Sequence, residues 1–234
     1  MMGKHRRKPF WLILAGSGLA LILGYLFVRM VRHGGNEQLC ALILLLKTVG
    51  LLASAVLVLG TVDAPVFKRF CPRNPIFDCR KVIHSPAGKM FGLIHAADMG
   101  VLYFASTLLL LALTVLTPDF YYYALLLAAL NLLTLPYTLF SVAYQAFKVG
   151  KWCALCLIVQ LVFWLEFWQF YPFLFGTPPQ IEFSLSLIHP LVLAFGLPPV
   201  LWLMVRHLVE KAYPVDPASQ PDGMDQGTGS KTTL

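Results

Sequence analysis

Four of the five cysteines form two pairs, and the spacing within each pair points to chemistry. Cys153 and Cys156 make a C-x-x-C at the start of a long apolar segment. In a helix, residues three positions apart share a face, and the start of a helix favours the thiolate, the form that attacks disulfides. Cys71 and Cys79 lie in a polar loop at a spacing that allows a disulfide. Both pairs therefore predict thiol–disulfide chemistry.

The composition predicts that these cysteines are positioned by membrane helices. Of 234 residues, 58% are hydrophobic and only 12% charged, and the mean hydropathy is +0.72. A water-soluble domain of this size could not cover so much apolar surface with polar groups. The net charge of +7 does not indicate nucleic-acid binding, because the basic residues are confined to short segments between apolar runs. We therefore expect an all-α, multi-pass membrane protein.

Six runs are long and apolar enough to cross a bilayer, because a spanning helix needs about 20 mostly apolar residues. They cover approximately residues 10–31, 40–62, 92–117, 120–147, 153–172 and 186–208. The alternating pattern of a membrane β-barrel is absent, and an open strand does not survive in lipid. The tail, residues 211–234, is rich in Pro, Gly, Asp, Ser and Thr, and we expect it to be disordered.

The order of these runs places both cysteine pairs on one side of the membrane. Two crossings separate the 63–91 loop from the 148–153 segment, so two dithiols face each other and can exchange electrons. Cys40 begins a run at the opposite face, and we interpret it as a packing residue. The sequence contains no haem, dinucleotide or iron–sulfur motif. A lipid-soluble quinone is therefore the simplest electron acceptor.

The two cysteine motifs together resemble the signature of the vitamin K epoxide reductase family. The resemblance lies in Cys71-Pro-Arg-Asn-Pro-Ile-Phe-Asp-Cys79, in the following Ser85, Gly88 and Phe91-Gly92, and in Trp152-Cys153-Ala-Leu-Cys156. It covers approximately residues 40–172 and implies a four-helix bundle around a quinone, capped by the cysteine loop, with a short half-helix near Ser85. A basic N-terminus with one extra helix (1–39) and an extra C-terminal helix (173–210) then flank this core.

The resemblance also implies an electron path. Cys71 and Cys79 look like the shuttle pair that takes electrons from a separate thioredoxin-like dithiol protein. Cys79 would attack a Cys153–Cys156 disulfide at Cys153, and Cys156, nearest the bilayer, would deliver electrons to a quinone of menaquinone, ubiquinone or vitamin K type. Ser85 resembles the serine that supports the cap, and a turn or helix cap before Pro86 is its alternative interpretation.

The chain departs from the vertebrate pattern at positions that contact the substrate. Gln160 occupies the place of a tyrosine that hydrogen-bonds the substrate, and the asparagine near the quinone has no clear counterpart. His95 or Asp98 is a candidate substitute, because ionisable groups within membrane spans are costly and usually functional; local pairing is the alternative. We therefore favour an enzyme that reduces a quinone in order to form disulfides. The alternative is an enzyme whose main activity is the reduction of vitamin K epoxide or vitamin K quinone.

Two other functions stay open at this stage. The four cysteines could bind a soft metal ion, or they could staple the loop of a membrane scaffold. The membrane side stays open as well. Disulfide formation favours a periplasm or lumen, whereas most Lys and Arg residues lie on the cysteine face, which favours the cytoplasm. We expect a location in the cell inner membrane or an equivalent membrane.

Overall fold

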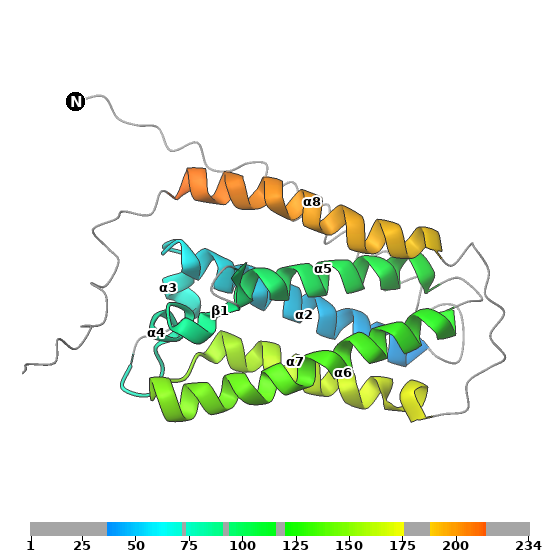
Figure 1. Cartoon of the computed structure of the whole chain (residues 1–234), viewed down its shortest axis with the longest axis horizontal. Helices are drawn as coiled ribbons and strands as arrows, with labels where there is room; N and C mark the ends of the chain where they lie inside the picture. The colour runs from blue at the N-terminus through cyan, green and yellow to red at the C-terminus, as the bar shows by residue number, and fades with distance from the viewer. Residues whose placement is uncertain (1–36, 72–73, 91–93, 116–119, 176–187, 214–234) are drawn as a thin grey trace, which may run out of the picture.

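Five long apolar helices run side by side and form the body of the molecule (Figure 1). They are α2 (Glu37–Thr61), α5 (Ala96–Thr114), α6 (Phe120–Tyr144), α7 (Ala154–Phe175) and α8 (Ile188–Ala212). The computed structural model describes residues 37–71, 74–90, 94–115, 120–175 and 188–213. A helix satisfies its backbone hydrogen bonds internally, which is why apolar runs of this length fold as helices in lipid.

The prediction of an all-α membrane protein is confirmed by these helices. Each of the five is long and apolar enough to cross a bilayer, and each coincides with one predicted run to within a few residues at its ends. The predicted first run, 10–31, and nearly all of the 211–234 tail lie outside the described residues. The four long helices α2, α5, α6 and α7 form a bundle in which α2 packs on α5 and α7, and α6 packs on α7.

Helix α8 lies against the outer side of α5 (Figure 1). Only 11% of its apolar window is buried inside the protein, so most of its large side chains face outward. Leu203, 71% exposed, and Met204, 63% exposed, are examples. In a membrane these side chains contact lipid, where exposed apolar surface carries no penalty.

A buried polar network ties the four helices α2, α5, α6 and α7 together. Lys47 of α2 lies 3.2 Å from Glu166 of α7, and the side chains of both are fully buried. The Glu166 carboxylate also accepts hydrogen bonds from Asn131 of α6 at 3.3 Å and from Tyr103 of α5 at 3.4 Å. A buried charge is tolerated only when paired and hydrogen-bonded, which this arrangement provides.

The described part of the 63–91 loop, residues 63–71 and 74–90, folds as a cap at one end of the bundle (Figure 1). It contains the short helices α3 (Phe67–Phe70) and α4 (Cys79–Ile83), the 3-10 turn η1 (Pro86–Gly88) and the strand β1 (Lys89–Met90). β1 pairs antiparallel with β2 (Ile94–His95), and Lys89 lies opposite His95. The half-helix expected near Ser85 corresponds to α4 followed by the turn η1. The cap positions the first cysteine pair.

Candidate redox site

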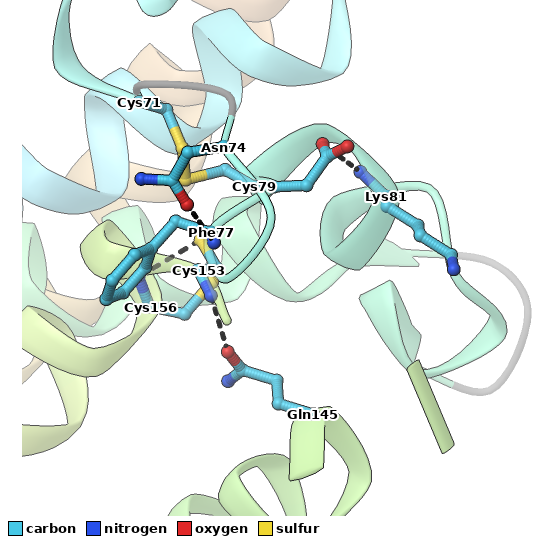
Figure 2. Close-up of a disulfide and its surroundings, with 9 residues drawn as sticks. Cys71, Asn74, Phe77, Cys79, Lys81, Gln145, Cys153 and Cys156 are labelled. Atoms are coloured by element: carbon cyan, nitrogen blue, oxygen red, sulfur yellow. Dashed lines mark hydrogen bonds between the residues drawn. A yellow bond between two sulfur atoms is a disulfide. The ribbon is translucent and has the colours of Figure 1, made fainter. Parts of the chain in front are cut away.

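The structure brings both cysteine pairs together at the cap end of the bundle. Cys71 and Cys79 form a disulfide with a Cα–Cα distance of 6.0 Å, while Cys153 and Cys156 are free thiols (Figure 2). Cys71, Cys79 and Cys153 belong to one buried cluster, and Cys156 packs against it. The predicted meeting of four cysteines at one end of the bundle is therefore present. Cys40, a buried thiol, packs in a separate cluster with Leu44.

Backbone hydrogen bonds dock the cap onto the segment that precedes the C-x-x-C. The amide of Asp78 donates to the Trp152 carbonyl at 3.0 Å, and the amide of Trp152 donates to the Ile76 carbonyl at 3.0 Å. The Lys151 ammonium donates to the Pro75 carbonyl. Cys79 and Cys153 are the next residues after Asp78 and Trp152, so this bridge fixes the two cysteines in adjoining positions.

Local turns in the cap set up this docking. The Asn74 side chain accepts hydrogen bonds from the amides of Ile76 at 2.9 Å and Phe77 at 2.7 Å, which folds the loop between the cysteines (Figure 2). The Asp78 carboxylate caps α4 by accepting from the Lys81 amide at 3.2 Å. Asn and Asp side chains favour such turns and caps because they accept from nearby amides.

Cys153 sits at the position just before the first turn of α7. Its sulfur accepts a hydrogen bond from the Cys156 amide at 3.3 Å, in the place where a serine or aspartate would cap a helix. Its own amide donates to the buried Gln145 side chain at 2.8 Å (Figure 2). These two bonds hold Cys153 at the start of α7.

A π-helical turn, η2 (Gln145–Val149), carries Gln145 to this point at the end of α6. The turn ends at Gly150, whose φ of 62° lies in the left-handed region that favours glycine. The chain then reverses directly into Lys151 and the C-x-x-C. Inserted π turns in α-helices frequently occur at functional sites.

A cavity of about 730 Å³, its open mouth included, lies under the cap between α2, α5, α6 and α7. Of the four site cysteines, all in described segments, Cys156 is the one that lines it. Most of the wall is apolar, with polar groups at a few points. The lining includes Ser54, Ser85, Gly88, His95, Tyr137, Ser141, Gln145, Cys156 and Gln160.

Two of the residues that line the cavity each have a buried polar atom without a hydrogen-bond partner. These atoms are the hydroxyl of Ser54 and the carbonyl oxygen of Gln160. The amide nitrogen of Gln160 donates to the Ser141 hydroxyl at 2.7 Å, and Gln145 donates to the same hydroxyl at 3.5 Å. Buried polar atoms are normally paired, so these groups favour an occupant that carries polar atoms within an apolar body.

A comparison with protein families identifies the family of this chain. The model of the vitamin K epoxide reductase family matches residues 41–171, which is more than half of the chain. The chain belongs to the vitamin K epoxide reductase family. A search of curated proteins and a search of solved structures find no match.

Family membership makes this chain a membrane oxidoreductase. The activity of the family is redox chemistry related to disulfides and quinones. The matched segment runs from the start of α2 almost to the end of α7, so it holds the whole cap and all four site cysteines. Helix α8 lies beyond it.

Ser85, which resembles the serine that supports the cap in this family, lines the cavity. Its hydroxyl donates to the Val82 carbonyl at 2.6 Å and does not cap the η1 turn. The bond holds the end of α4 against the turn above the cavity. A role of Ser85 in supporting the cap during catalysis stays a prediction.

The residues at which the chain departs from the vertebrate pattern do not all line the cavity. Gln160 and His95 both line it, whereas Asp98 is not part of the lining. The Asp98 carboxylate instead lies 3.3 Å from Arg206 and 3.7 Å from His95. Asp98 is therefore a paired group, with His95 three positions before it and with the distant Arg206 of α8. Direct quinone contact by Gln160 and His95 stays a prediction.

Sequence reasoning missed the polar residues that α6 and η2 bring to the site. Tyr137, Ser141 and Gln145 all line the cavity, and Gln145 bonds Cys153 directly. Their spacing of four residues puts them on one face of a helix, a polar stripe in an otherwise apolar run. That stripe is the signal that could have identified them.

Gly88 is required where η1 approaches α4, and its replacement gives a prediction. A Cβ at this position would lie 2.0 Å from the Ile83 carbonyl oxygen, so Gly88→Ala must push the turn away from the helix. We expect the thermal unfolding of the variant to show a loss of about 1–3 kcal/mol. Gly196→Ala is the control, because a Cβ there meets nothing within 4 Å. Equal stability of Gly88→Ala and Gly196→Ala would contradict this account of the cap.

Proposed function

We propose that this protein passes electrons from a thioredoxin-like dithiol partner, through Cys71/Cys79 and Cys153/Cys156, to a quinone, and so supports disulfide formation. The observation that carries the proposal is the position of Cys156. Its neighbour in the motif, Cys153, adjoins the cap disulfide, and Cys156 itself lines the cavity. The C-x-x-C therefore has one sulfur on each side of the boundary between cap and cavity.

The electron path has two exchanges and one oxidation. A partner dithiol reduces the Cys71–Cys79 disulfide and becomes a disulfide itself. The Cys79 thiolate attacks Cys153 in a Cys153–Cys156 disulfide and releases Cys156, and Cys71 then displaces Cys153 and restores the Cys71–Cys79 disulfide. The Cys153/Cys156 dithiol finally gives up two electrons and two protons. A bound quinone supplies the capacity to accept both.

The cavity suits a quinone on two grounds. Its wall is mostly apolar, as a prenylated ring requires. The unpaired Ser54 hydroxyl can donate to a quinone carbonyl, and the free Gln160 carbonyl can accept from a hydroquinone hydroxyl. Both oxidation states of the ring thus find a partner.

The exchange between the pairs can be captured by removing the resolving cysteine. In Cys71→Ala, attack of Cys79 on Cys153 has no second thiol in the cap to complete it, so the Cys79–Cys153 mixed disulfide should accumulate. Alkylation of free thiols, followed by non-reducing digestion and mass spectrometry, identifies it. The Cys71→Ala, Cys153→Ala double variant is the control and should lack that peptide pair. A Cys79 thiol that stays fully alkylated in the single variant would contradict the relay.

The function itself is tested by steady-state turnover. The purified full chain is supplied with a dithiol reductant and a short-chain ubiquinone or menaquinone. The quinone absorbance should then fall at a rate proportional to the enzyme concentration. Absence of protein-dependent consumption with both quinones would overturn the proposal.

The metal-binding alternative finds no support in the described segments. They contain no group of three or more His, Cys, Asp or Glu side chains that could hold an ion. The Cys71–Cys79 disulfide also removes two of the four thiolates that such a site would need.

A further inference from the structure

Helix α8 lies outside the segment matched by the family, yet its Arg206 pairs with Asp98, which lies 3.7 Å from the cavity-lining His95. The Arg206 side chain is only 18% exposed. Its guanidinium lies 3.3 Å from Asp98 of α5 and donates to the Thr61 hydroxyl of α2 at 3.1 Å. A second bond joins it to Glu210 on its own helix at 2.8 Å. An arginine on a lipid-facing helix therefore points inward, to the point where three helices meet.

Asp98 connects this arginine to the cavity. One carboxylate oxygen faces Arg206, and the other lies 3.7 Å from Nδ1 of His95. Trp202 of α8 hydrogen-bonds the same carboxylate. Asp98 is thus held by two side chains of α8 and presents its remaining oxygen to His95, which lines the cavity.

Burial is the main reason why the His95 ring is neutral near pH 7. Burial lowers the pKa of His95, and Arg206 of α8, Lys89 of β1 and His84 after α4 lower it further. Asp98 of α5 opposes them, and the net shift is downward from 6.5. With Nδ1 facing a carboxylate, the ring proton resides there, which leaves Nε2 as an acceptor.

We propose that Arg206 is a positioning residue for the cavity, which holds Asp98 and thereby orients His95 toward the oxygen of a bound quinone or hydroquinone. This inference rests on the proposed function, because it names a polar contact of the same site. The neutral ring accepts a hydrogen bond from a hydroquinone hydroxyl. The protonated ring donates one to a quinone carbonyl.

Quinone affinity should therefore depend on pH through His95. As the pH falls through the His95 pKa, the ring becomes a donor and quinone binding tightens by about three- to tenfold. Arg206→Gln removes a nearby positive charge, so the His95 pKa rises, and the midpoint of the transition should move up by about one pH unit. Arg206→Lys retains the charge and should keep the original midpoint.

The test measures the equilibrium binding of a short-chain ubiquinone to the full chain in detergent, between about pH 5 and 8. Quenching of tryptophan fluorescence reports the binding. His95→Gln should abolish the pH dependence, and Arg206→Gln should change nothing further in that background, which a structural role of Arg206 could not explain. Lys211→Gln on the same helix removes an equal charge and serves as the control.

Each outcome distinguishes the two proposals. The positioning role is overturned if the midpoint of the pH transition in quinone affinity does not move in Arg206→Gln. It is also overturned if Arg206→Gln changes quinone affinity equally with His95 present and with His95 replaced. Quinone binding itself stands in both cases. An absence of any ubiquinone binding by the unaltered protein overturns both.

Discussion

Replacement of Cys156 by serine is expected to lower dithiol-dependent quinone reduction by more than about a thousandfold. Cys156 is the site cysteine that lines the cavity, and it is one half of the dithiol that must be oxidised. A serine hydroxyl fills nearly the same space, but it forms no disulfide and gives up no electrons under these conditions. The expected loss is therefore chemical, with the fold retained.

Cys40→Ser provides the matched control for that experiment. Cys40, like Cys156, is a free thiol on a membrane helix, but it packs in a cluster that contains none of the site cysteines. Turnover of Cys40→Ser should stay within about twofold of the unaltered protein, since its sulfur lies outside the path. Appreciable turnover in Cys156→Ser would remove Cys156 from the mechanism.

The second large effect concerns stability. Lys47→Met is expected to destabilise the protein by about 3–5 kcal/mol, because it leaves the Glu166 carboxylate buried without its cation. Asn131 and Tyr103 still donate to that carboxylate, but neither neutralises its charge. Equilibrium unfolding in mixed detergent and dodecyl sulfate micelles measures the difference.

A second substitution separates charge from packing in this network. Glu166→Gln, added to Lys47→Met, removes the unpaired charge and keeps an oxygen that accepts from Asn131. We expect the double variant to recover most of the lost stability. If the double variant is no more stable than Lys47→Met alone, packing of the lysine chain is the main contribution and the charge argument is wrong.

The sequence could predict those parts of the protein that depend on local pattern. Apolar length was sufficient to locate the five described spans, because lipid leaves the helix as the only common solution. Counting crossings was sufficient to put Cys71 and Cys79 at the same end as Cys153 and Cys156. These inferences need no knowledge of side-chain contacts.

Contacts between distant residues could not be predicted in this way. Lys47 and Glu166 lie 119 positions apart, and Asp98 and Arg206 lie 108 apart, so no local spacing indicates that they pair. From the sequence, Asp98 has two interpretations: it contacts the quinone, or it pairs with a neighbouring group. Only the packing of α8 on α5 assigns its carboxylate to Arg206.

The cap illustrates the same limit on a smaller scale. A polar loop rich in proline gives no sign that Phe77 pairs with Trp152, since strand-like pairing of so few residues depends on where the loop docks. That pairing sets the approach of Cys79 to Cys153, on which the electron path depends.

The central claim, that the Cys153/Cys156 dithiol reduces a quinone directly, is tested by a single turnover without external reductant. Protein with both thiols reduced is mixed anaerobically with excess short-chain quinone, and hydroquinone and new disulfides are then quantified. We predict one hydroquinone per chain, with a new disulfide mapped to Cys153 and Cys156. Thiols that stay reduced in the presence of quinone, or hydroquinone formed without that disulfide, would contradict the account.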